Sequence, residues 1–236
     1  MRVATWNLQR CSPHSRSRLP RILDWMKSIG PDVWVLTETY RDLSPGPAYS
    51  LVACSADAPD RRFEQGECWT AIWSRLPAEI HELAGDRERC AAAVVVGLPI
   101  VGTVLPWLAD SRDSFRGADA FCARLAEQAQ EWSRLQAEFG CICVAGDFNQ
   151  DLLESGHYYG SNRGRAALRD TLHEAGLECI TAPPNDPLGA VGLACIDHIC
   201  VGGVGAGGLG VWPPSGQLDR KVSDHHGFHV EVERIT

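Results

Sequence analysis

Ser223-Asp224-His225 places a carboxylate and an imidazole side by side, just before residues 228–232, where apolar and polar side chains alternate as in a half-buried strand. Comparable polar residues stand at the ends of four other expected strands: Trp6-Asn7, Glu38, Gly146-Asp147-Phe148-Asn149 and Ile196-Asp197-His198. Acid, amide and imidazole groups at strand ends predict a site assembled across a sheet. Their chemistry suits a metal ion and a phosphoester.

The rest of the chain alternates expected strands and helices. Strands are predicted at residues 2–7, 33–36, 49–54, 68–74, 92–96, 100–105, 141–144, 178–181, 196–201 and 228–232. Apolar residues at helical spacing predict helices at residues 19–29, 119–139 and 163–175. Residues 202–210 are rich in glycine and are predicted to form a loose surface loop. An α/β protein with a single domain over residues 1–236 is the simplest interpretation.

Composition indicates a globular protein of the cytoplasm. No apolar run approaches the ~18 residues that a membrane helix needs, so no transmembrane segment is expected. The first residues resemble a strand and show no signal peptide. Without export, the ten cysteines are expected to stay reduced and to pack as small hydrophobic residues.

The net charge of -8 opposes tight, sequence-independent binding to a long polyanion. The positive charge is almost entirely arginine, which is suited to bidentate contacts with phosphate. Candidates for an arginine-lined pocket are Arg10, Arg89, Arg163 and Arg165. Nothing in the sequence indicates a protein partner.

Hydrolysis of a phosphoester needs a cation to neutralise charge, a base for water and a donor to the leaving oxygen. Glu38 is a natural ligand for Mg²⁺, which Mn²⁺ could replace, and Asn7 could assist near the metal or the phosphate. Asp147 and Asn149 are two residues apart, so on an extended segment they would point the same way. Asp147 could then position the attacking water while Asn149 donates a hydrogen bond to the developing oxyanion.

The last two motifs supply the remaining groups. His225 could bind a phosphoryl oxygen or act as acid or base, and Asp197 could orient its imidazole. Asp224 is then left as a carboxylate near a second metal or in the outer shell. A single Asp or Asn at a strand end is usually a turn residue. The joint occurrence of all these residues, in order, is what favours a functional site over a set of unrelated turns.

This ordered set resembles the endonuclease/exonuclease/phosphatase superfamily, the Mg²⁺-dependent fold that includes deoxyribonuclease I, apurinic endonucleases, sphingomyelinases and inositol-phosphate 5-phosphatases. The matching motifs are Thr5-Trp6-Asn7, Leu36-Thr37-Glu38-Thr39, Gly146-Asp147-Phe148-Asn149, Ile196-Asp197-His198-Ile199 and Ser223-Asp224-His225. The resemblance implies a four-layer α/β sandwich in which two packed mixed β-sheets are flanked by helices. It also implies a metal-ligand Glu38 beside Asn7, a water-activating or leaving-group Asp147, a phosphate-contacting Asn149, a coupled Asp197–His225 pair and a metal-proximal Asp224.

Two positions depart from the family pattern. Many relatives carry His or Tyr shortly before a proline in the central strand, whereas residues 102–107 here read Gly-Thr-Val-Leu-Pro-Trp. His157, Tyr158 or an arginine could supply the missing contact. Nuclease relatives also often place an acid two residues after the first Asn, where this chain has Gln9.

The leading hypothesis is a metal-dependent phosphoester hydrolase. Its substrate would be either nucleic acid or a small molecule or lipid headgroup, and the sequence does not separate these. The alternative is a protein that binds phosphate or nucleic acid and retains the fold without turnover, for which the departure in the central strand is the only support. A third hypothesis is an interaction domain with an incidental acidic cluster.

Overall fold

The computed structural model describes residues 1–56, 64–110, 116–154, 159–214 and 217–234. One sheet has the strand order β11 (Val204–Trp212), β12 (Gly227–Arg234), β1 (Arg2–Asn7), β2 (Val33–Tyr40), β4 (Glu67–Ser74) and β3 (Ser50–Cys54). The second has the order β5 (Ala78–Ile80), β6 (Ala91–Val95), β7 (Leu98–Val104), β8 (Ile142–Asp147), β10 (Asp197–Gly202) and β9 (Glu178–Cys179). The helices are α1 (Leu19–Ile29), α2 (Ala118–Phe139) and α3 (Asn162–Glu174), with a 3-10 turn η1 at Gly189–Val191.

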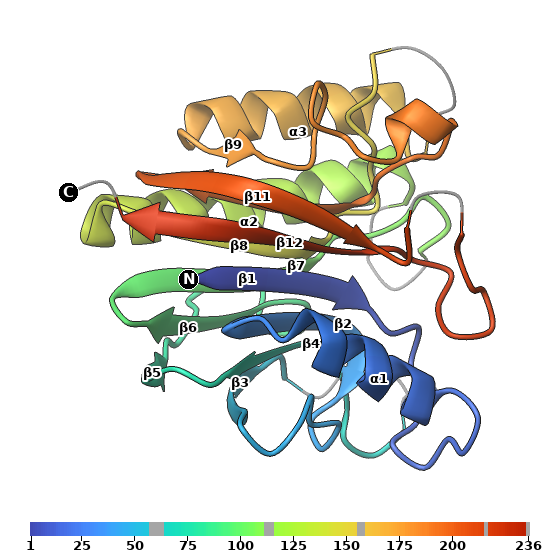
Figure 1. Cartoon of the computed structure of the whole chain (residues 1–236). Helices are drawn as coiled ribbons and strands as arrows, with labels where there is room; N and C mark the ends of the chain where they lie inside the picture. Colours follow the sequence, from blue (N-terminus) through green and yellow to red (C-terminus); the bar gives the residue numbers. More distant parts are fainter. Residues whose placement is uncertain (57–63, 111–115, 155–158, 215–216, 235–236) are drawn as a thin grey trace.

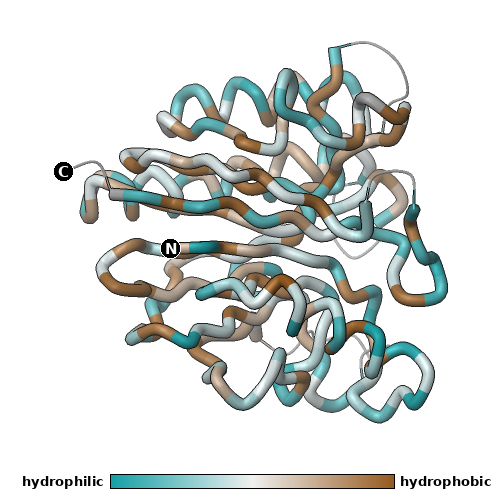
Figure 2. The backbone as a smooth tube through the Cα atoms, in the orientation of Figure 1, coloured by the Kyte–Doolittle hydropathy of each residue, from teal (hydrophilic) through white to brown (hydrophobic). Residues whose placement is uncertain are grey.

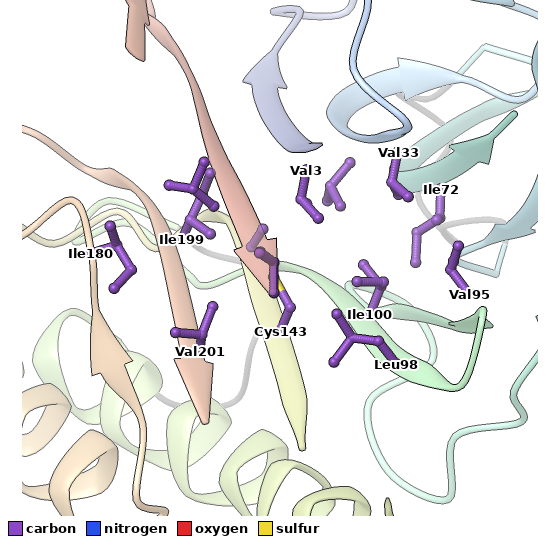
Figure 3. Close-up of a cluster of buried hydrophobic side chains, with 14 of the residues drawn as sticks. Val3, Val33, Ile72, Val95, Leu98, Ile100, Cys143, Ile180, Ile199 and Val201 are labelled. Atoms are coloured by element: carbon purple, nitrogen blue, oxygen red, sulfur yellow. The ribbon is translucent and has the colours of Figure 1, made fainter. Parts of the chain in front are cut away.

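The two sheets pack face to face through aliphatic side chains. Figure 3 shows Val3 and Val33 of the first sheet opposite Ile100, Cys143 and Ile199 of the second. These five side chains are fully buried. Burial of a Val, Leu or Ile side chain contributes about 1.5–3 kcal/mol, so this contact between the sheets is a main source of stability.

Helices cover the outer faces of both sheets (Figure 1). On the first sheet, Ile22 and Met26 of α1 pack with Trp6, Trp34 and other buried residues. On the second, Phe121 and Trp132 of α2 join the side chains that α3 contributes. In Figure 2, hydrophobic residues recur along the strands, while many residues of α3 are hydrophilic. The predicted four-layer α/β sandwich is confirmed.

The direction of the strands brings the polar motifs to one edge. β1 is parallel to β2, and β7 is parallel to β8, so Asn7 and Asp147 stand at the carboxyl ends of their strands. β10 is antiparallel to β8, and β12 is antiparallel to β1. The residues that begin β10 and precede β12 therefore lie at the same edge as the ends of β8 and β1.

The expected helices are present with boundaries shifted by one residue at most. α1 and α2 both stop at a glycine in the left-handed conformation, Gly30 with φ 51° and Gly140 with φ 71°. α3 begins after Ser161, whose hydroxyl accepts a hydrogen bond from the Gly164 N–H at 2.9 Å.

The prediction of a loose loop over residues 202–210 is wrong. The glycines belong to β11, an edge strand that pairs with β12 through residues 204–212, with an irregularity between Gly207 and Gly210. A Cβ atom on Gly210 would lie 2.2 Å from the His229 ring, so glycine is needed for close packing there. Composition alone suggested flexibility because it does not show the partner strand. β2 is also longer than predicted and continues through Glu38 to Tyr40.

Gly146 is required by the backbone of the neighbouring strand. Its φ is 145°, and a Cβ atom would lie 2.0 Å from the Thr103 carbonyl oxygen. We expect Gly146→Ala to lower the free energy of unfolding by about 3 kcal/mol or more, because backbone must move to relieve the overlap. Urea denaturation followed by circular dichroism measures this. Gly205→Ala is the control, since its Cβ would meet nothing closer than 3.7 Å; equal stability of the two variants would contradict the prediction.

Candidate active site

Two carboxylates and an imidazole meet at the edge of the second sheet. Asp147, the last residue of β8, is directly opposite Asp197, the first residue of β10, in the antiparallel pair. Asp197 Oδ2 lies 2.6 Å from His225 Nδ1. Both aspartates are buried, and the His225 side chain is 15% exposed. The imidazole therefore has one nitrogen held by a buried carboxylate and the other directed toward more open surroundings.

The end of β1 is tied to both neighbouring groups. Asn7 Nδ2 donates to Asp147 Oδ2 at 3.0 Å, and Asn7 Oδ1 accepts from the Gln9 N–H at 2.7 Å. The Ser223 hydroxyl donates to the Asn7 carbonyl at 2.8 Å and accepts from the His225 N–H at 3.1 Å. The first sheet thus positions the aspartate of the second sheet, and Ser223 fixes the loop that carries His225.

Asn149 is not on an extended segment. Its φ is 50°, and its N–H donates to Asp147 Oδ1 at 2.9 Å across a tight turn. Asn149 Nδ2 donates to the Leu105 carbonyl at 2.9 Å. The predicted extended geometry is therefore wrong, and the asparagine reaches the site through a left-handed turn, which Asn tolerates better than most residues.

Contacts with Arg10 fix the position of Glu38. Its backbone has a φ of 44°, and its carbonyl accepts from the Arg10 N–H at 2.8 Å. Arg10 Nε lies 3.5 Å from Glu38 Oε2 and 3.1 Å from Oε1 of the buried Glu67. The Arg10 guanidinium also stacks over the Trp69 ring at 5.1 Å from its centroid. One arginine therefore bridges two glutamates, and it rests on an aromatic surface.

The grouping of acids controls protonation at the site. Burial and the Asp197 carboxylate raise the pKa of Asp147 to about 7, with a smaller contribution from Glu38. For His225, burial lowers the pKa, but the Asp197 carboxylate outweighs burial and raises the pKa to about 10, with Asp147 and Asp224 adding to the rise. The imidazole is therefore protonated at neutral pH and offsets part of the acidic charge.

These side chains fit a divalent cation. A carboxylate oxygen of Asp147, one of Asp197 and a ring nitrogen of His225 all lie within 4.8 Å of one another. Because the imidazole is protonated, the two carboxylates are the ligands that this cluster offers to a cation. Asp197 Oδ1 is buried and has no hydrogen-bond partner among the described residues, which marks it as an oxygen available to a cation. The Glu38 carboxylate also raises the pKa of Asp147, so Glu38 lies near enough to interact electrostatically with this cluster. Oxygen-rich donors of this kind suit Mg²⁺ or Mn²⁺.

The structure brings Asn7, Asp147, Asp197 and His225 close together, and Asn149 contacts Asp147 through its backbone N–H. Asp224 is further out: its side chain is 48% exposed, and its Oδ1 lies 3.7 Å from His225 Nε2. The metal-ligand roles assigned to Glu38, Asn7 and Asp224 and the catalytic roles of the other residues stay predictions.

Most of the candidate arginines lie elsewhere. Arg89 is buried against Asp110, Arg165 pairs with Asp151, and the exposed Arg163 pairs with Asp119. Of these four arginines, Arg10 has a contact with a candidate ligand within the described part of the chain, the ion pair with Glu38. Arg220 was not singled out from the sequence, because its loop gives no pattern that would place it near His225.

Arg220 lines a cavity of about 260 Å³ beside the site. Asp197, Asp224 and His225 form one side of this cavity, and its other walls are mainly apolar and include Leu188, Leu193, Ile196, Leu218 and Phe228.

Tyr159 is a second residue that sequence reasoning missed. It also lines this cavity, and burial together with Asp147, Asp224 and Asp197 raises its pKa. Gln150 Nε2 donates to the Tyr159 carbonyl at 3.0 Å and anchors its loop. His157 and Tyr158, suggested as substitutes for the absent central His or Tyr, lie outside the described residues. In the central strand, the Thr103 hydroxyl donates a hydrogen bond to Gln128 Oε1 at 2.5 Å.

The chain matches the model of the Endonuclease/Exonuclease/phosphatase family over residues 4–225. The chain belongs to this family. No curated protein sequence matches it. The family resemblance drawn from the five motifs is thereby confirmed.

Solved structures show the same fold at low identity. A 3′-5′ exonuclease (NExo) from Neisseria meningitidis is 18% identical, with a TM-score of 0.69 over 99% of this chain and 100% of that chain. An AP endonuclease from Archaeoglobus fulgidus is 17% identical, with a TM-score of 0.70 over 98% of both chains. The endonuclease domain of TRAS1, a telomere-specific non-LTR retrotransposon, is 15% identical, with a TM-score of 0.66 over 100% of this chain and 99% of that chain.

None of the helices in the described ranges is long and apolar enough to cross a bilayer. All ten cysteines are free thiols, and most are buried.

The raised pKa values predict that stability without metal falls as pH rises. The folded pKa of Asp147, about 7, exceeds the ordinary value of about 3.9, so its contribution is present below pH 4 and is lost as pH rises through 7. The contribution of His225 is present below about pH 6.5 and is lost as pH rises through 10. In EDTA we expect Tm to fall between about pH 5 and pH 9, and Mg²⁺ to raise Tm more at pH 8 than at pH 6, since a cation binds the deprotonated site.

Differential scanning calorimetry of the whole chain tests this expectation. Asp147→Asn is the control, because it removes the titrating carboxyl and should flatten the curve between about pH 5 and pH 7. An unchanged curve in this variant would assign the pH dependence to other groups.

Proposed function

We propose that the protein is a hydrolase of phosphoesters that depends on Mg²⁺ or Mn²⁺. The observation that carries this proposal is the buried Asp147–Asp197–His225 cluster, which unites a carboxyl with a pKa near neutrality, a protonated imidazole and a carboxylate oxygen without a partner among the described residues. A buried acid cluster of this kind disfavours a purely structural role, because burying like charges is costly unless they serve a ligand or a reaction.

Each residue has a role that follows from its contacts. Asp147 has a pKa of about 7, so near neutral pH it can accept a proton from water as the water attacks phosphorus. The Asn7 amide fixes the orientation of this carboxylate through the 3.0 Å hydrogen bond. His225 is fixed by Asp197 at Nδ1, which leaves Nε2–H to donate to a phosphoryl oxygen and to stabilise the charge that develops there.

A bound divalent cation would supply charge neutralisation for the phosphate and for the leaving oxygen. Glu38 and Asp197, through its Oδ1, are the residues that would hold it, with Asp224 near the opening, so that Asp147 is left as the base. The Arg10 guanidinium keeps the Glu38 carboxylate in place, at 3.5 Å.

The cavity beside His225 supports a substrate with a compact organic group next to its phosphate. Its volume is about 260 Å³, its walls are largely apolar, and Arg220 adds a positive charge. Among structures of the same fold, one is a variant of the 3′ phosphatase NExo from Neisseria bound to a product DNA hairpin. The end of a nucleic acid and a small phosphoester both meet these requirements, whereas the net charge of -8 disfavours non-specific binding along a duplex.

Loss of either central group should abolish most of the activity. We expect Asp147→Asn and His225→Ala each to lower kcat by about 100-fold or more, the usual scale for loss of acid–base or oxyanion assistance. Hydrolysis of bis-p-nitrophenyl phosphate, p-nitrophenyl phosphate and a 3′-phosphorylated oligonucleotide, with Mg²⁺, Mn²⁺ or EDTA, measures this and separates diester from monoester preference.

Asp170→Asn is the matched control, since Asp170 is exposed on α3. Wild-type rates in Asp147→Asn would refute the assigned roles. Specific binding of the oligonucleotide without turnover in any metal would instead support a binding protein that retains the fold.

Glu38→Gln should weaken metal use more than chemistry. The amide is neutral and still fits beside Arg10, so we expect the Mg²⁺ concentration for half-maximal rate to rise about ten-fold or more, with most of the rate recovered at high Mg²⁺. Metal titrations of activity and of Tm give independent readouts. Glu233→Gln is a control far from the site, and a Glu38→Gln titration that overlays the wild type would exclude Glu38 as a ligand.

A further inference from the structure

Cys179 and Cys200 face each other across strands β9 and β10. At the next position along the strands, the Ile180 N–H donates to the Ile199 carbonyl at 2.9 Å, so Ile180 and Ile199 form a hydrogen-bonded pair. Such pairs alternate along an antiparallel ladder with pairs whose members share no backbone hydrogen bond, and Cys179 and Cys200 are therefore a pair of the second kind. Opposed Cα atoms at such a pair are about 4.5 Å apart, which is within the range that a disulfide spans.

Of these two cysteines, Cys179 is the one whose thiol a small reagent can reach. It is half-buried, whereas Cys200 is fully buried. Cys179 lines a cavity of about 440 Å³ between α3, β9 and the loop that follows β8, with Arg169 and His173 on its wall. None of the residues that line this cavity belongs to the Asp147–Asp197–His225 cluster, so the two sites are separate.

Two polar groups hold the Cys179 sulfur in position. Sγ lies 3.5 Å from His198 Nδ1 and 3.5 Å from Thr181 Oγ1. His198 Nε2 faces the Gln150 carbonyl at 2.9 Å, and a carbonyl only accepts, so Nε2 carries the hydrogen and Nδ1 is an acceptor. Nδ1 is therefore placed to accept a hydrogen bond from the Cys179 thiol, the arrangement in which an imidazole assists a reactive cysteine.

The other accessible cysteines lack this arrangement. Cys54 is half-buried on β3, where its cross-strand neighbour is Ala71. Cys122 is half-buried on α2 and packs against the hydrophobic cluster beneath that helix. These two residues provide internal comparisons for reactivity.

We propose that Cys179 and Cys200 form a peroxide-reactive dithiol that closes to a disulfide across β9 and β10. The Cys179 thiol gives up its proton, its sulfur attacks one oxygen of hydrogen peroxide, and the O–O bond breaks. The leaving hydroxide takes up the proton that the Cys179 thiol released and departs as water. The resulting sulfenic acid on Cys179 is attacked by the Cys200 sulfur, the S–O bond breaks, and a second water leaves with the Cys200 proton. Two thiols are oxidised by two electrons in all, and one peroxide is reduced to two waters.

Peptide mapping of the full folded chain tests this pair directly. The protein is treated with limiting hydrogen peroxide, its free thiols are blocked with N-ethylmaleimide, and the digest is analysed by mass spectrometry without reductant. We expect a peptide pair joined through residues 179 and 200, removed by dithiothreitol, absent from Cys179→Ser and Cys200→Ser, and still present in Cys122→Ser. In Cys200→Ser, Cys179 should accumulate as a sulfenic acid that dimedone labels.

The proposal is overturned if peroxide oxidises Cys54 or Cys122 without joining residues 179 and 200, or if dimedone fails to label Cys179 in Cys200→Ser. Circular dichroism verifies that each variant is folded. If a serine variant does not fold, the wild-type map alone decides, because absence of the 179–200 link contradicts the proposal by itself. The experiment uses no phosphoester, so its outcome is independent of the proposed hydrolase function.

Discussion

The repulsion between Asp147 and Asp197 is the constraint on which the candidate site depends. The ladder between β8 and β10 places the two buried carboxylates directly opposite each other. The fold offsets this repulsion by placing His225 against Asp197 at 2.6 Å and the Asn7 amide against Asp147 at 3.0 Å. Asn7 and His225 belong to the first sheet and its connections, so packing of one sheet on the other is what assembles the site.

Backbone strain is concentrated around the same edge. Of the non-glycine residues with positive φ in the described part of the chain, Gln9, Arg10, Glu38 and Asn149 all lie in segments that end at the site. Such conformations cost about 1–3 kcal/mol each and persist where the surroundings determine them strongly. Here the Gln9 N–H is bound by Asn7, the Arg10 N–H by Glu38, and the Asn149 N–H by Asp147. These hydrogen bonds therefore hold the three residues in their left-handed conformations.

The sequence predicted the fold well where periodicity reflects burial. Helices α1 and α2 were recognisable because their apolar spacing and terminal glycines are local signals. β11 was missed because its glycines carry no such signal, and only the ladder with β12 makes them a strand. Tyr159 and Arg220 were missed for a related reason: both lie on irregular segments, and neither has a pattern that places it beside His225.

The residue types of the site, and their order along the chain, could be read from the sequence by itself. Polar groups beside strongly apolar strands cost folding free energy unless they have partners or bind a ligand. Asp147, Asp197 and His225 can therefore be recognised as candidate site residues from the sequence. Only the tertiary structure decided their mutual geometry: the antiparallel register that opposes the two aspartates, the left-handed turn at Asn149 and the pairing of Glu38 with Arg10. These features arise from contacts between residues far apart in the chain, such as the bond from Asn7 to Asp147, and no local pattern encodes such contacts.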